Sequence, residues 1–195
     1  MHELFNKGRY NDILNHYDGL SFMCDYPVPL MYKLAYCRYQ KNAKFILTVR
    51  QDSKEWYESL LRHNALAHPF KHKHRWGAKR YYPHGFEEEH RAYYERHVAE
   101  VKKFFMEHKA ENQLLVISVA EAGAVKKIED FLGISFGTDV MPHENRSDKK
   151  KASFSNKLKR SYNRVVQPIY GFIAPKITRK QVKPVYEAEP SALEE

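Results

Sequence analysis

The chain has 195 residues, 43% of them hydrophobic and 29% charged, which is typical of a single globular domain. No apolar run approaches the roughly eighteen residues of a membrane span, and the first ten residues contain no apolar segment of the signal-peptide kind. The two cysteines, Cys24 and Cys37, are too few for a disulfide scaffold or a four-cysteine zinc site. We therefore expect buried, reduced thiols in a cytoplasmic protein without a transmembrane segment.

The positive charge is concentrated near the C-terminus. The whole chain carries +9, whereas Asp148–Pro184 alone carries eleven Lys or Arg against one acidic residue. This difference predicts a domain over residues 1–147 and a basic extension with an acidic end over residues 148–195. Such an extension either contacts an anionic surface or is simply solvated, and nucleic acid is not an expected partner.

The first part of the chain predicts two helices separated by a strand. Glu3–Tyr17 has helical periodicity and ends at Asp18-Gly19, a turn sequence. Leu20–Cys24 is a short apolar run that fits a buried strand. Pro27 suits the first turn of the next helix, whose expected core residues are Leu30, Met31, Leu34, Ala35 and Tyr36.

Two continuous apolar runs, Lys44–Val49 and Leu114–Val119, are the clearest strands and are typical of parallel strands covered on both faces. Between them we expect a helix capped by Asp52 or Ser53 and ending near His63, then a long helix over Phe86–Lys109. A shorter helix over Ala122–Leu132, with Gly133 as its C-terminal cap, follows the second strand. Alternating strands and helices predict a three-layer α/β fold with a central parallel sheet.

Arg50 directly follows the first core strand, and Ser59 lies on the next helix. Ligands of open α/β sheets bind at the carboxyl ends of the strands. A guanidinium fork and a hydroxyl placed there can hold a phosphate. An arginine in this position can equally be the structural partner of a neighbouring carboxylate, so both interpretations remain open.

Several sequence blocks occur in an order and spacing that resemble the sulfotransferase family. They are DYPVPLMYKL, AKFILTVRQDSKEWYESL, LLVISVAEAGAVKKIEDFLGI and MPHEN, which together cover about residues 1–145. The resemblance implies that Arg50 and Ser59 bind the 3′-phosphate of 3′-phosphoadenylyl sulfate, the sulfuryl donor. It implies no metal, and a small-molecule or glycan acceptor with a hydroxyl or amine. Family members commonly have this serine one residue closer to the arginine.

One expected element has no counterpart in the sequence. Sulfotransferases open with a strand, a P-x-x-G-T loop followed by Ser or Thr, and a helix, which together hold the 5′-phosphosulfate. This chain resembles the family from after that element, so we expect either an N-terminally truncated sequence or a protein without catalysis. Asp25, in Asp25-Tyr26-Pro27, matches the place of the family's His-x-Pro base. It is a candidate catalytic base by resemblance, or else a capping carboxylate.

Two further segments carry functional hypotheses. His68, His72 and His74 lie in a basic loop that could touch an anionic acceptor, although no further ligand completes a metal site there. Phe154–Ile169 has apolar residues at helical spacing with Lys and Arg between them, which is typical of a basic amphipathic helix. We expect that helix to dock on the body of the protein.

Overall fold

The computed structural model describes residues 1–66, 83–118, 120–140 and 154–177. These residues divide into two compact units. The first contains Met1–Phe45 and Val101–Leu114, and the second contains the remaining described residues. No helix in the described ranges has both the length and the apolar character needed to cross a membrane.

The first unit is helical. Its elements are α1 (His2–Asn6), α2 (Tyr10–Tyr17), the 3₁₀ turns η1 (Val28–Leu30), η2 (Gln40–Asn42) and η4 (Glu111–Gln113), α3 (Tyr32–Tyr39), and the last turns of α6 (Glu87–Glu107). Aromatic rings join α3 to the end of α6, with Tyr36 and Phe104 centroids 5.3 Å apart. Four of the five predicted core residues are buried, namely Leu30, Met31, Leu34 and Ala35, whereas Tyr36 is half-buried.

Two predictions for this unit are wrong. The expected single helix over Glu3–Tyr17 is broken at Gly8, whose φ of +72° is a left-handed conformation that glycine adopts readily. Leu20–Cys24 forms no strand: Leu20 and Phe22 are 57% and 70% exposed, and the Cys24 thiol is exposed rather than buried. Positive φ angles at Gly19 and Asp25 turn the backbone at both ends of this run.

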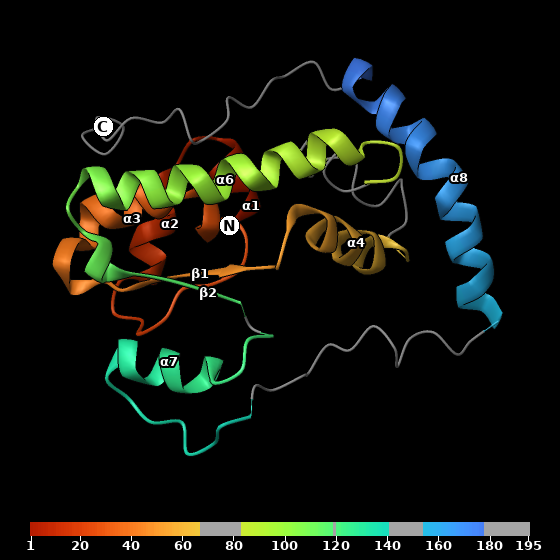
Figure 1. Cartoon of the computed structure of the whole chain (residues 1–195). Coiled ribbons are helices and arrows are strands. Elements are labelled where there is room, and N and C mark those ends of the chain that lie inside the picture. The colour runs from red at the N-terminus through yellow and green to blue at the C-terminus, as the bar shows by residue number, and fades with distance from the viewer. Residues whose placement is uncertain (67–82, 119, 141–153, 178–195) are drawn as a thin grey trace. The chain divides into compact units, whose positions relative to one another are not determined.

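The second unit contains the sheet. Strands β1 (Phe45–Val49) and β2 (Leu114–Ser118) pair in parallel, as Figure 1 shows, and their first residues lie in the first unit. The helices of this unit are α4 (Ser53–Asn64), most of α6, α7 (Ala124–Leu132) and α8 (Phe154–Ile177).

The α/β class and both predicted strands are therefore confirmed. The described sheet has two strands, which are mostly half-buried rather than covered on both faces, so a three-layer arrangement is not established.

Helix α8 docks on α4 through polar side chains. Asn163 and Gln167, both buried, donate their amide N–H groups to the carbonyl oxygens of Ala65 and Asn64, each at 3.0 Å. Carbonyl groups at the end of a helix lack partners within the helix, so α8 caps the C-terminus of α4. The amphipathic helix predicted over Phe154–Ile169 is confirmed and extends to Ile177.

Candidate functional site at the end of strand β1

Arg50 is held where β1 ends by a tyrosine of α6. The Arg50 backbone N–H donates to the Tyr94 hydroxyl at 2.8 Å, and that hydroxyl donates to the Arg50 carbonyl at 3.4 Å. The Tyr94 hydroxyl thus bonds both the N–H and the carbonyl group of Arg50, which a neighbouring strand would bond in a wider sheet. The Tyr94 ring stacks on Trp56, with centroids 4.9 Å apart and an interplanar angle of 21°.

Reciprocal hydrogen bonds fix the start of α4. Asp52 accepts from the Glu55 backbone N–H at 2.7 Å, which confirms the predicted N-cap. The Glu55 carboxylate reaches back and accepts from the Gln51 backbone N–H at 3.0 Å. This arrangement is a close variant of the capping box. It sets where α4 begins, and therefore where Ser59 lies relative to Arg50.

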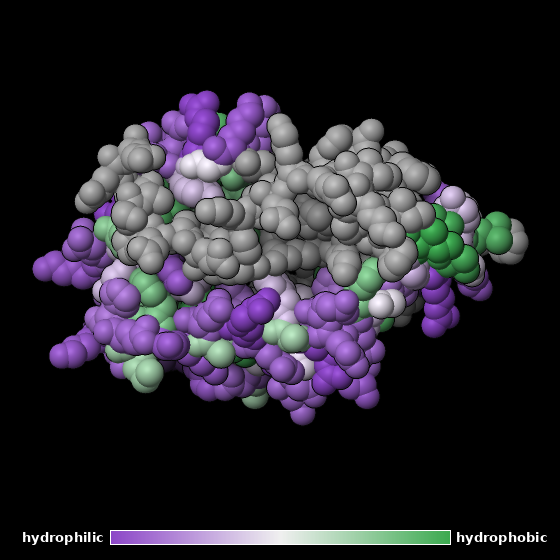
Figure 2. Space-filling model, turned by 90° about the horizontal axis from the view of Figure 1, so that it is seen from above, coloured by the Kyte–Doolittle hydropathy of each residue, from purple (hydrophilic) through white to green (hydrophobic). Residues whose placement is uncertain are grey.

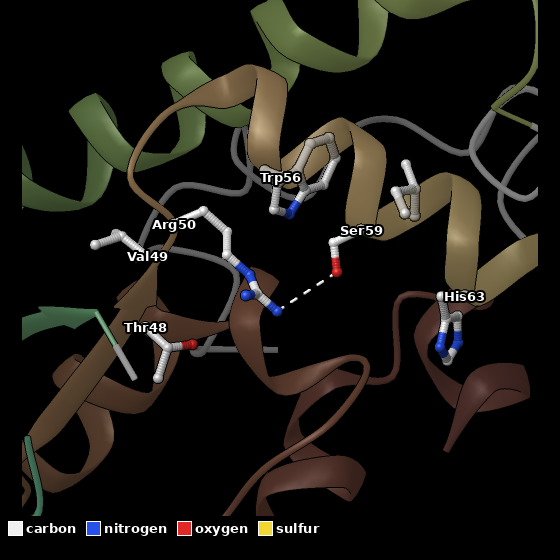
Figure 3. A pocket seen from close by; sticks show the side chains of 7 residues that line it. Thr48, Val49, Arg50, Trp56, Ser59 and His63 are labelled. Carbon is white, nitrogen blue, oxygen red and sulfur yellow. Dashed lines mark hydrogen bonds between the residues drawn. The ribbon is translucent and has the colours of Figure 1, made fainter. Parts of the chain in front are cut away.

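The structure brings Arg50 and Ser59 together. The guanidinium donates through Nη2 to the Ser59 hydroxyl at 3.4 Å and through Nη1 to the Glu55 carboxylate at 3.3 Å. Figure 3 shows the arginine extending from the strand end towards the serine on α4. Arg50 therefore makes the contacts expected of both interpretations. It faces Ser59, as a phosphate-binding arginine would, and it forms an ion pair with Glu55, as a structural arginine would.

Arg50 and Ser59 line a surface cavity of about 320 Å³. This volume lies at the lower end of the range for small-molecule sites. The lining residues are Thr48, Val49, Arg50, Trp56, Ser59, Leu60 and His63. Four of them come from α4 at helical spacing, so they share one face of the helix (Figure 3). The cavity combines a permanent cation, two hydroxyls, an imidazole and an indole, a set suited to a phosphate attached to an organic group.

A polar cluster around the buried Ser53 anchors α4 to α6. Ser53 is 5% exposed, accepts from the Arg91 Nε at 3.1 Å and donates to the Glu95 carboxylate. One turn further on, the Tyr57 hydroxyl donates to the Pro83 carbonyl at 2.8 Å. Burial raises the pKa of Tyr57, with smaller contributions from the charges of α6. The Tyr57 hydroxyl therefore stays protonated and serves as a structural donor.

The other predicted site residues are placed differently. Asp25 belongs to the first unit, where its side chain is exposed and its carbonyl accepts from the Val28 N–H at 2.9 Å. The partial burial that would favour an aspartate base is therefore not found at this position. His68, His72 and His74 lie outside the described residues, as does the MPHEN block. Within the described ranges, no three His, Cys, Asp or Glu side chains are grouped so as to hold a metal ion.

Sequence reasoning did not identify Glu55, Tyr94 and His63 as parts of the site. In the sequence, Glu55 is one of several acidic residues that favour the start of a helix, and Tyr94 is one of several residues on the apolar face of the next long helix. His63 could have been found, because it lies four residues after Ser59 and so on the same helix face. For Tyr94, 44 residues from Arg50, the sequence carries no comparable signal.

Comparisons with protein-family models, with curated proteins and with solved structures found no match to this chain. The resemblance to sulfotransferases thus depends on the quoted sequence blocks alone.

Proposed function

We propose that the cavity beside β1 binds the 3′-phosphate of 3′-phosphoadenylyl sulfate or of its product, adenosine 3′,5′-bisphosphate. The supporting observation is the convergence of the Arg50 guanidinium and the Ser59 hydroxyl on one cavity. An arginine offers two parallel N–H donors to a phosphate, and the serine adds a third donor beside them. Trp56, in the same cavity, supplies an aromatic surface for the organic part of the ligand.

The proposed reaction is sulfotransferase-like. A sulfuryl group would pass from the phosphosulfate oxygen to a hydroxyl or amine of the acceptor, which gives up its proton. The charge that develops on the phosphate must be stabilised as the sulfur–oxygen bond breaks. A P-x-x-G-T loop, which does this in sulfotransferases, does not occur in the 195 residues. We therefore propose that this chain binds the nucleotide and transfers sulfate slowly or not at all.

Calorimetric titration with adenosine 3′,5′-bisphosphate tests the binding proposal. Replacing Arg50 with alanine removes a charge-assisted contact, which contributes about 1.5–3 kcal/mol. The dissociation constant should rise about 10- to 150-fold. Adenosine 5′-monophosphate, which lacks the 3′-phosphate, should bind the wild type weakly and lose little in the Arg50→Ala variant.

Arg62→Ala is the matched control. Arg62 lies on the same helix and forms a comparable exposed ion pair, with Glu58 at 3.8 Å, but it does not line the cavity. Both variants lower the net charge by one, so a general effect of charge would appear equally in each. Equal affinities in the two variants, or no binding of the bisphosphate by the wild type, would contradict the proposal.

An assay that measures transfer of labelled sulfate from the donor to a panel of hydroxyl and amine acceptors tests the second part of the proposal, that this chain transfers sulfate slowly or not at all. Little turnover is expected, because loss of electrostatic stabilisation at the reacting group typically costs several kcal/mol of barrier. Rapid turnover by the 195-residue chain would show that another segment replaces the missing loop.

A further inference from the structure

Helix α8 presents an apolar stripe to solvent. Its members, called the outer stripe below, are 57%, 54%, 64% and 54% exposed in chain order: Leu158, Tyr162, Val165 and Ile169. Their spacing of four, three and four residues places them within about 60° of one another around the helix axis. In Figure 2, hydrophobic and strongly hydrophilic residues lie side by side over α8.

The orientation of α8 is the reverse of that of an ordinary surface helix, whose apolar face points to the core. The side towards α4 carries Asn163 and Gln167, which are 4% and 0% exposed and hydrogen-bonded to the end of α4. The outer stripe lies on the opposite side of the helix. Burial against the body of the second unit therefore does not account for the outer stripe.

The charges around the outer stripe indicate what can cover it. Lys157 and Arg164 lie about 110° and 130° from the centre of the stripe on one side, and Lys159 lies about 90° from it on the other. All three side chains are exposed, and α8 contains five basic and no acidic residues. Long basic side chains beside an apolar stripe can place their charges at lipid headgroups while the stripe enters the acyl boundary.

The same charges disfavour two other partners for the outer stripe, a second copy of the helix and a nucleic acid. Pairing the outer stripe with that of a second copy would bring the flanking charges of both helices together, six in all, with no acidic residue on either helix to balance them. A nucleic acid backbone would attract the lysines but would gain little from four apolar side chains in the centre of the contact.

We propose that α8 binds the surface of a lipid bilayer that contains anionic lipids. The helix lies in the plane of the interface, with the outer stripe in the acyl boundary and the flanking lysines and arginine at the headgroups. The anchors Asn163 and Gln167 would hold the second unit against the membrane through α4. This contact is independent of the proposed nucleotide site, because the outer stripe and the cavity have no residue in common.

Co-sedimentation of the full chain with vesicles tests the proposal. One set contains phosphatidylcholine with about one-third phosphatidylserine, and the other contains phosphatidylcholine alone. Binding to the anionic vesicles should be at least about tenfold tighter, and it should weaken in 0.5 M salt because the charges are screened. Replacing both Leu158 and Val165 with glutamine should weaken binding by about tenfold or more. Replacing Lys157 and Lys159 with glutamine should do the same on anionic vesicles only.

Met106→Gln is the matched control. Met106 is 59% exposed on α6, so this variant also removes an exposed apolar side chain from a helix. It should bind vesicles as the wild type does, and circular dichroism should show all variants folded. Equal binding to neutral and anionic vesicles, or unchanged binding after the Leu158 and Val165 replacements, would overturn the proposal. A concentration-dependent dimer abolished by those replacements, without vesicle binding, would also overturn it and assign the stripe to a second copy.

Discussion

Glu55 competes with any phosphate for the guanidinium of Arg50. In the structure its carboxylate is 3.3 Å from Nη1 of Arg50, and the same carboxylate caps the start of α4 by accepting from Gln51. The Glu55→Gln variant separates these two roles. A glutamine oxygen still accepts the Gln51 N–H bond, since capping boxes use Glu or Gln, but the negative charge is lost. We therefore expect nucleotide binding to tighten and the fold to weaken slightly.

The magnitudes follow from the exposure of the pair. The side chains of Arg50 and Glu55 are 36% and 39% exposed, and pairs of this kind contribute about 0.2–1 kcal/mol. Repulsion between a carboxylate and a dianionic phosphate about 6 Å away adds about 1 kcal/mol in water-like surroundings, and roughly half of that after salt screening. Together these effects predict a three- to tenfold lower dissociation constant for adenosine 3′,5′-bisphosphate. Stability should fall by about 1 kcal/mol, because the ion pair and the favourable charge at the helix N-terminus are both lost.

Glu58→Gln is the control for this prediction. It changes the net charge by the same amount on the same helix and breaks a comparable ion pair, but its partner, Arg62, does not line the cavity, whereas Arg50 does. Affinity is measured by calorimetry at low and at 0.5 M salt, and stability by urea denaturation. The gain in affinity should be specific to Glu55→Gln and should shrink at high salt. If Glu55→Gln binds the nucleotide no more tightly than Glu58→Gln does, Arg50 does not bind the phosphate as proposed.

Three further predictions concern stability, each measured by urea denaturation. Hydrogen bonds from Arg38 lower the pKa of Asp18 below its ordinary 3.8. The ionised Asp18 therefore stabilises the folded protein above pH 3.8, and this stabilisation is lost as the pH falls further. Asp18→Asn should therefore destabilise the protein at pH 7 and have little effect near pH 2. Burial lowers the pKa of His84 below 6.5, so the unfolded chain binds the proton more readily and stability should fall below pH 6.5. That decline should be smaller in His84→Asn. Gln167→Leu leaves the carbonyl of Asn64 without this donor and should cost about 1–3 kcal/mol, whereas no loss would show that α8 does not cap α4.

The predictions that succeeded depend on neighbours in the chain. Asp52 caps α4 because an aspartate three residues before a backbone N–H can reach it. Gly133 ends α7 with a φ of +74°, as expected for a glycine that follows a helix. The strands were identified by uninterrupted apolar runs. Each of these signals lies within a few residues of the feature that it predicts.

The predictions that failed depend on partners far along the chain or on an alternative local conformation. Leu20–Cys24 has the composition of a strand, but a strand also needs a neighbour with which to pair, and composition does not reveal one. Gly8 lies within a helical pattern and yet adopts a left-handed conformation that divides the pattern in two. For α8 the pattern predicted the helix correctly, but only the structure shows that Asn163 and Gln167 form its docked side.

The side chains of the proposed phosphate site come from one short segment, which α6 holds in place through Tyr94. Arg50, Glu55 and Ser59 lie within ten residues, on a strand end and a helix whose start is fixed by reciprocal capping bonds. A fold that preserves this strand, turn and helix, together with their contacts to α6, therefore preserves the proposed 3′-phosphate site. Sulfuryl transfer makes a different demand, because the base and the groups that hold the phosphosulfate must come from separate segments and meet within tenths of an ångström. Binding of the nucleotide can thus persist in a chain where catalysis does not, since the proposed phosphate contacts need only this segment and the α6 side chains that hold it, Tyr94 among them.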